Sequence, residues 1–234
     1  MPFSPSGSGG GSSVLQADTT VTVGSGGDYA TINEALEYLS QFFPAYIQEG
    51  YTAEISLLTG FVMSEQVIAK GVNLGWITIT SVDAEVVIDR SALTIGFEGA
   101  FPAFAACNGT LPIIDVLFNM DSSGSATTRD GINISTNSDA TALPGKGVKN
   151  AGGKGAFIAK TSRAELDGAV FTGAGTYGIE ARDMSHVNAE SSDTSGATTG
   201  GLRVISAGLI EASGATGTLS QTANTLTGNG IIFQ

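Results

Sequence analysis

The sequence has few of the residues that mark several common classes of protein. Its 234 residues include one cysteine, Cys107, and also only one histidine and one tryptophan. A single cysteine cannot form a disulfide within the chain, so stability must come from packing or from oligomerisation. No stretch approaches the roughly 18 to 20 apolar residues of a membrane-spanning helix. We therefore expect no membrane insertion.

Basic residues are also scarce. Ten lysines and arginines stand against 22 aspartates and glutamates, which gives a formal net charge of −12 at pH 7, and the basic residues form no patch in the sequence. Such a chain repels nucleic acid and anionic lipid, so we expect neither as a partner. Residues 1–13 lack the basic start and the apolar stretch of a secretory signal peptide, and we expect none there.

Glycine is abundant where proline and charge are rare. The chain has 33 glycines and 6 prolines, and 14% of its residues are charged while 41% are apolar. Abundant glycine suits tight turns and stacked small side chains, and the apolar share argues against disorder. The length fits one large all-β domain behind a Gly/Ser-rich leader.

Three consecutive stretches in the last third of the chain begin with glycine at a constant interval. Gly155, Gly178 and Gly201 lie 23 residues apart, and a further stretch starts 24 residues earlier at Gly131. A repeat of this length is typical of a solenoid. Small or apolar residues alternate with polar ones, which predicts two short strands per repeat with the polar residues facing outward. The columns predicted to face inward are Ala156, Ile179 and Leu202; Ile158, Ala181 and Val204; Ala164, Val187 and Ile210; and Leu166, Ala189 and Ala212.

The N-terminal half predicts one helix among strands. Residues 19–24, TTVTVG, alternate like a strand, and residues 30–43 carry an apolar face at helical spacing. That face consists of Ile32, Ala35, Leu36 and Leu39. Further strands are predicted at YTAEISLL, GWITIT, AEVVID and LTIGF, and again over residues 111–118.

The order of TVTVGSGGDYATINEAL and then ISLLTGFVMSEQVIAKGVNLGWITIT resembles the N-terminal cap and first coils of pectate-lyase-like right-handed parallel β-helices. Phage members of that group are trimeric spikes, and the resemblance covers about residues 19–218. It implies an all-β right-handed parallel β-helix with an N-terminal capping helix, assembled as a homotrimer. The chain then divides into a particle-attachment leader (1–18), a strand and capping helix (19–50), the β-helix (51–218) and a C-terminal strand that locks the trimer (219–234).

The resemblance also implies a function. In phage spikes and fibres the leader binds other virion proteins, so we expect synthesis in the bacterial cytoplasm and assembly into an extracellular virion. We expect a structural spike or fibre that attaches the particle to a host surface glycan or receptor. The alternative is a spike depolymerase, a glycosidase or polysaccharide lyase acting on capsule or lipopolysaccharide. A secreted adhesin is a third reading, which the lack of a signal peptide disfavours.

Apolar residues at predicted outward positions indicate a partner surface. Ile205 and Leu209 stand in columns that hold polar residues one repeat earlier, and the chain ends on Ile231, Ile232 and Phe233. We predict these five residues as trimer contacts. A loop or tail of the same chain would cover Ile205 and Leu209 equally well.

Two acidic residues are the candidates for catalysis. Asp167 and Glu190 occupy equivalent positions in successive repeats, about 4.8 Å apart along the stack, near the roughly 5 to 5.5 Å of a retaining glycosidase. Glu165 and Glu211, two repeats apart, fall near the roughly 6.5 to 9.5 Å of inverting enzymes. His186 is the only histidine and a possible base. An acidic solvated face produces such pairs by chance, which favours a chain without catalysis.

Neither a metal nor a cofactor is expected. Polysaccharide lyases of this fold type use a Lys or Arg base with acidic calcium ligands, and Lys160 stacked over Asp183 is the nearest approach. One salt bridge explains that pair equally well. No cluster of three or four carboxylates accompanies it. The glycine-rich stretches lack the dinucleotide and phosphate-loop fingerprints.

Overall fold

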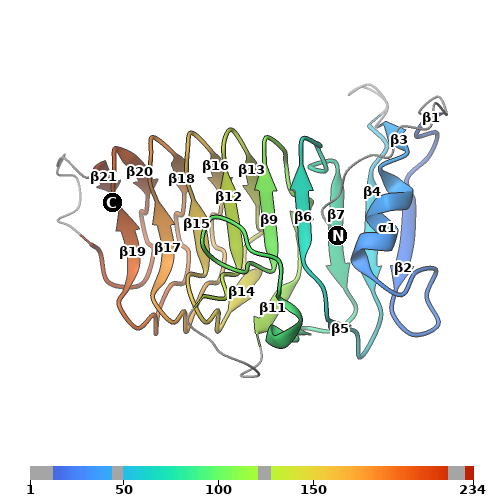
Figure 1. Ribbon diagram of the computed structural model, residues 1–234, viewed down its shortest axis with the longest axis horizontal. Coiled ribbons are helices and arrows are strands. Elements are labelled where there is room, and N and C mark those ends of the chain that lie inside the picture. The colour runs from blue at the N-terminus through green and yellow to red at the C-terminus, as the bar shows by residue number, and fades with distance from the viewer. Residues whose placement is uncertain (1–12, 44–49, 121–127, 221–229) are drawn as a thin grey trace.

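Parallel β-strands make up most of the structure. The computed structural model describes residues 13–43, 50–120, 128–220 and 230–234, and every pair of strands in these parts of the chain is parallel. Figure 1 shows the strands standing side by side along the long axis, with the N-terminal strands at one end and the C-terminal strands at the other. The prediction of an all-β chain with parallel strands is confirmed.

Apart from one short pair, the described strands form three columns, in which each strand joins its equivalents in neighbouring repeats. Column 1 holds β2 (Thr19–Val23), β4 (Ala53–Leu57), β7 (Ile77–Ser81) and β10 (Ile113–Ile114), and continues through single bridges into β13 (Asp139–Thr141), β16 (Arg163–Glu165), β18 (His186–Asn188), β20 (Gly208–Glu211) and β21 (Gly230–Phe233). Column 2 holds β5 (Val62–Met63), β8 (Val86–Ile88), β11 (Leu117–Met120) and β14 (Gly147–Lys149). Column 3 holds β6 (Val67–Lys70), β9 (Phe104–Cys107), β12 (Ile132–Ser135), β15 (Ala156–Ile158), β17 (Tyr177–Ala181) and β19 (Gly200–Val204). The short pair is β1 (Ser13–Val14) and β3 (Phe42–Phe43).

The register of the columns confirms the predicted inward positions. Ala156 pairs with Ile179 and Ile179 with Leu202, and the other predicted columns are likewise buried. The extra residue of the repeat that starts at Gly131 lies in a turn. The pairing offset is 24 between Thr141 and Glu165 but 23 at the next bridge, so the turn after β13 absorbs the difference without disturbing a strand.

Close backbone packing explains why the repeats begin with glycine. A Cβ atom added to Gly155 would lie 2.5 Å from the carbonyl oxygen of Gly178, and one added to Gly178 would lie 2.8 Å from that of Gly201. Carbon and oxygen atoms that are not bonded do not approach so closely, so only glycine fits. None of these three residues has a positive φ. The repeat therefore preserves a close approach between neighbouring strands rather than a special turn conformation.

The predicted helix is confirmed over a shorter span. Helix α1 (Ile32–Leu39) starts at a capping box between Thr31 and Glu34, and all four predicted apolar residues are buried. The Glu65 carboxylate accepts hydrogen bonds from the backbone N–H groups of Ile32, at 2.6 Å, and Asn33, at 3.0 Å. Burial raises the pKa of Glu65 above its ordinary value, and these hydrogen bonds oppose the shift. The predicted C-terminal part of the helix instead forms β3.

The predicted strand LTIGF, residues 93–97, is wrong. After the short 3₁₀ helix η1 (Arg90–Ala92), residues 93–103 form a loop that docks on column 3, seen in green in Figure 1. Gln66, which precedes β6, holds the loop because its side chain accepts the N–H of Ile95 at 2.6 Å and donates to Pro102 O at 2.7 Å. The segment after this loop, for which the sequence offered no pattern, contains β9.

The C-terminal residues add a strand to column 1. In β21, Ile231 pairs with Leu209 and Ile232 with Ile210. Ile232 is fully buried within this chain, whereas Ile231 and Leu209 are half-buried and Phe233 is 41% exposed. Packing within this chain therefore accounts for the burial of Ile232, and the tail residue Ile231 flanks Leu209. Among the described residues, no helix has the length and apolar character needed to cross a membrane.

Candidate functional site

A polar hollow lies on the outer face of column 1. It has a volume of about 330 Å³ and spans β13, β16 and β18. Successive side chains of a strand point to opposite faces. Ala140, Ala164 and Val187 are buried, so the residues on either side of them in the same strands face outward. We call this hollow the column 1 groove, and its polar lining consists of Asp139, Thr141, Arg163, Glu165, His186 and Asn188.

The groove side chains form two parallel rows. One row runs from Asp139 through Arg163 and His186 to Leu209. The other row runs from Thr141 through Glu165 and Asn188 to Glu211. Parallel strands lie about 4.8 Å apart, so each row presents polar groups at a fixed spacing.

Two contacts hold the second row in place. Asn188 Nδ2 donates a hydrogen bond to Glu165 Oε1 at 2.6 Å. His186 Nε2 lies 3.4 Å from Glu211 Oε1, and both side chains are nearly half exposed, at 46% and 44%. Glu165 and Glu211 are two strand spacings apart, roughly 9.6 Å, which is just above the roughly 6.5 to 9.5 Å typical of inverting glycosidases. Carboxylate and amide groups arranged this way suit ligands rich in hydroxyl groups.

Asp167 and Glu190, the two predicted catalytic residues, lie outside the groove. They occupy equivalent turns after β16 and β18, where Gly168 N donates to the backbone oxygen of Glu190 at 2.7 Å. Asp167 is half-buried and Glu190 is exposed. Among the described residues, no hydrogen bond or ion pair reaches either carboxylate. Their role in catalysis stays a prediction.

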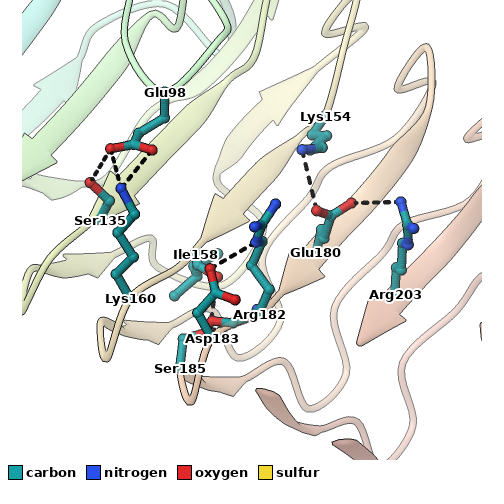
Figure 2. A network of polar contacts seen from close by, with 10 residues as sticks. All are labelled: Glu98, Ser135, Lys154, Ile158, Lys160, Glu180, Arg182, Asp183, Ser185 and Arg203. Carbon is teal, nitrogen blue, oxygen red and sulfur yellow. Dashed lines mark hydrogen bonds and ion pairs between the residues drawn. The ribbon is translucent and has the colours of Figure 1, made fainter. Parts of the chain in front are cut away.

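A second group of charged residues, which the sequence did not single out, lies on the outer face of column 3. Glu180 stands at an outward position of β17, yet its side chain is only 2% exposed. Its two carboxylate oxygens are 3.3 Å from Lys154 Nζ and 3.3 Å from Arg203 Nη1. Figure 2 shows Glu180 between these two cations. We call Lys154, Glu180 and Arg203 the Glu180 cluster.

Aromatic rings flank the two cations of this cluster. Lys154 Nζ lies 3.8 Å from the ring centre of Phe157, and the Arg203 guanidinium lies 4.7 Å from that of Tyr177. Both distances are within the range of cation–π attraction. The rings and the two cations leave the Glu180 carboxylate nearly no contact with water, so its charge depends on these partners.

A second buried carboxylate supports Lys154 from the neighbouring repeat. Asp130 is 3% exposed and accepts hydrogen bonds from the backbone N–H of Lys154 at 2.8 Å and from Asn133 Nδ2 at 3.1 Å. Burial raises the pKa of Asp130 above its ordinary value, while these hydrogen bonds and the charge of Lys154 oppose the shift.

The predicted pairing of Lys160 with Asp183 is wrong. Lys160 Nζ binds both oxygens of Glu98, at 2.8 and 2.9 Å, while Asp183 pairs with Arg182 at 2.9 Å (Figure 2). Glu98 lies 62 residues earlier in the loop that docks on column 3, and it also accepts a hydrogen bond from Ser135. Counting repeat positions could not reveal this partner, because the loop does not belong to the repeat.

One signal for the Glu180 cluster was present in the sequence. Glu180 and Arg203 are one 23-residue repeat apart and have opposite charges, so stacked strands place them side by side. The partner Lys154 precedes its strand and follows no column. Sequence periodicity therefore indicates the ion pair between Glu180 and Arg203, whereas the pair between Glu180 and Lys154 is found only in the structure.

The comparisons with family models and curated proteins assign no family to the chain. No protein-family model matches the chain, and no curated protein matches it either. Among the described residues, His, Cys, Asp and Glu side chains form no group of three or more that could hold a metal ion. Within the described residues, the column 1 groove and the Glu180 cluster are places where this chain's own chemistry indicates a function.

Proposed function

We propose that the chain is a structural spike or fibre protein of a phage or phage-like particle, which attaches the particle to a host surface glycan through the column 1 groove. The observation that carries this proposal is the groove itself, a hollow of about 330 Å³ on a stack of parallel strands. Its amide, carboxylate, imidazole and guanidinium groups follow one another along the two rows at one strand spacing. Successive hydroxyl groups of a sugar chain match such a series of donors and acceptors.

We further propose that the three columns close into a right-handed parallel β-helix. The chain passes from β4 to β5 to β6 and then returns to column 1 at β7, and the same order follows up to β15. In the later repeats single bridges at Val170, Asp193 and Thr216 take the place of column 2 strands. A repeated turn of this kind supports a solenoid. Helix α1 would cap its first repeat, since the helix contacts β2 and β4 and buries its apolar face. A rigid scaffold of this type suits display at a particle surface.

Trimer assembly is part of the same proposal. Ile205, Leu209 and Ile231 are half-buried and Phe233 is 41% exposed, all at the C-terminal end of the columns. Apolar residues in such positions favour a partner surface. Of the predicted particle-attachment leader, residues 1–12 lie outside the described residues. Light scattering of the full chain is expected to give three times the chain mass, and a single-chain mass would remove the trimer.

Glycan attachment is tested by binding to host surface polysaccharide. Replacing Asn188 by alanine removes an amide from the groove and releases Glu165, so we expect affinity to fall about tenfold, equivalent to about 1.4 kcal/mol. Surface plasmon resonance on immobilised capsule or lipopolysaccharide measures the change. Glu190→Gln is the control, because this exposed carboxylate lies outside the groove. Equal binding by wild type and Asn188→Ala, or binding to no host polysaccharide, would contradict the proposal.

Depolymerase activity is the second candidate function. The observation favouring it is that Glu165 and Glu211 share a row, with His186 beside Glu211. Assays for reducing ends and for unsaturated products on the same polysaccharides distinguish it from attachment alone. Product release that is lost in Glu165→Gln or Glu211→Gln would place hydrolysis in the groove. Loss in Asp167→Asn or Glu190→Gln would instead assign it to the two predicted residues.

A further inference from the structure

A second hollow lies at the C-terminal edge of column 3. Its volume is about 310 Å³, and it adjoins β19, the strand at which the order of this sheet ends. Its lining differs from that of the column 1 groove, because it holds a cation and no carboxylate. The lining includes Tyr177, Thr199, Arg203, Ile205, Thr218 and Ser220.

Arg203 is held in a fixed orientation at this hollow. Its Nη1 donates to Glu180 at 3.3 Å, and its guanidinium lies over the ring of Tyr177. Glu180 also forms an ion pair with Lys154, so two cations share one negative charge. The Arg203 side chain keeps 35% of its surface exposed, and Nη1 is the guanidinium nitrogen with a hydrogen-bond partner among the described residues. The other two nitrogens can therefore donate to a ligand.

The rest of the lining suits a sugar. Thr199 and Thr218 are exposed, and within the described part of the chain their hydroxyl groups have no hydrogen-bond partner. Tyr177 offers part of an aromatic ring beside the Arg203 guanidinium. Hydroxyl groups, an apolar face and one guanidinium match the hydroxyls, ring face and carboxylate of an acidic sugar.

We propose that this hollow binds a saccharide carrying a single carboxylate, such as a uronic acid, through Arg203. The inference rests on the proposed glycan attachment and adds a charged subsite away from the groove. The formal net charge of −12 repels ligands that carry several negative charges. One fixed guanidinium offsets that repulsion for one carboxylate. A ligand that spreads one charge among many hydroxyl groups therefore fits better than an acidic peptide.

The test compares two disaccharides that differ only at one carbon: cellobiouronic acid and its neutral counterpart cellobiose. Titration calorimetry with the full chain is expected to show at least tenfold tighter binding of the acid. Arg203→Gln should abolish this preference, and raising the salt concentration should weaken it. Lys70→Gln instead removes an exposed cation of β6, at the opposite end of column 3, and should leave the preference unchanged.

A folding control accompanies these variants. Arg203→Lys keeps a positive charge beside Glu180 but loses the planar fork, so we expect it to fold and to retain only part of the preference. Thermal unfolding of each variant shows whether its fold is intact. Equal affinity of the wild type for the two disaccharides would overturn the inference, as would a preference that persists in Arg203→Gln. Tighter binding of an acidic tetrapeptide than of cellobiouronic acid would overturn it in favour of a protein partner.

The two proposals fail in different ways. Host polysaccharide binding that needs Asn188, together with no selectivity for the acidic disaccharide, would leave glycan attachment standing and remove the Arg203 subsite. Arg203-dependent binding of cellobiouronic acid, with no host polysaccharide retained, would leave the subsite standing and remove the attachment function.

Discussion

Gly155→Ala is expected to lower the free energy of unfolding by about 3 kcal/mol, the upper part of the range for an overpacked core. The new Cβ would lie 2.5 Å from Gly178 O and 2.7 Å from Cβ of the fully buried Phe171. The strand cannot move away cheaply, because Gly155 N donates to Tyr177 O at 3.0 Å and its own carbonyl accepts from Ile132 at 2.9 Å. Relieving the clash would therefore break the backbone hydrogen bonds to the neighbouring strand on one side.

Urea denaturation followed by circular dichroism measures this loss. Gly96→Ala is the matched control, since Gly96 has no positive φ and the nearest atom to an added Cβ is 3.9 Å away on Phe101. That change should be neutral or stabilising by a few tenths of a kcal/mol up to about 1 kcal/mol, because alanine restricts the unfolded chain. If both variants unfold at the same urea concentration, close strand approach does not explain the glycine repeat.

Glu180→Ala is expected to lower the free energy of unfolding by about 2 to 3 kcal/mol. Removing one partner of a buried ion pair typically costs about 3 to 5 kcal/mol, because the remaining charge stays buried without compensation. Here the Lys154 and Arg203 side chains are 25% and 35% exposed, so water partly replaces the lost carboxylate and reduces the cost. The same urea experiment measures it.

Two further variants separate charge from volume. Glu180→Gln keeps the size of the side chain and one acceptor oxygen, so its loss should fall between those of wild type and Glu180→Ala. Glu190→Ala removes an exposed glutamate ten residues later and should stay within about 0.5 kcal/mol of wild type. A Glu180→Ala protein as stable as the Glu190→Ala protein would show that the buried carboxylate contributes no net stability.

Much of the strand arrangement could be predicted from the repeat. Ala164, Val187 and Ile210 differ in size, yet their spacing alone placed them in one buried column. The prediction succeeded because strands in a stack share one register, so residues at the repeat interval must be neighbours. Helix α1 was predicted for a similar reason, since its apolar face is continuous in the sequence.

Other features could not be obtained from periodicity. Residues 93–97 were predicted to form a strand because their apolar residues alternate. In the structure Leu93 is buried and Ile95 and Phe97 are half-buried, because the loop docks on column 3 rather than pairing in it. Glu180 was read as an outward polar residue, and its position is indeed outward. Its carboxylate is buried between Lys154 and Arg203, and each of these cations also contacts an aromatic ring.

The sequence by itself determined that the repeats form β-strands, which columns of residues face inward and where glycine stands in each repeat. These depend on spacing along the chain, and the backbone geometry of stacked strands converts spacing directly into contact. Only the tertiary structure decided which outward polar residues form a groove, which are buried, and that Lys160 binds Glu98 rather than Asp183. Those outcomes depend on loops and long side chains. Their partners are determined by proximity in the folded chain and by the free-energy cost of burying charge.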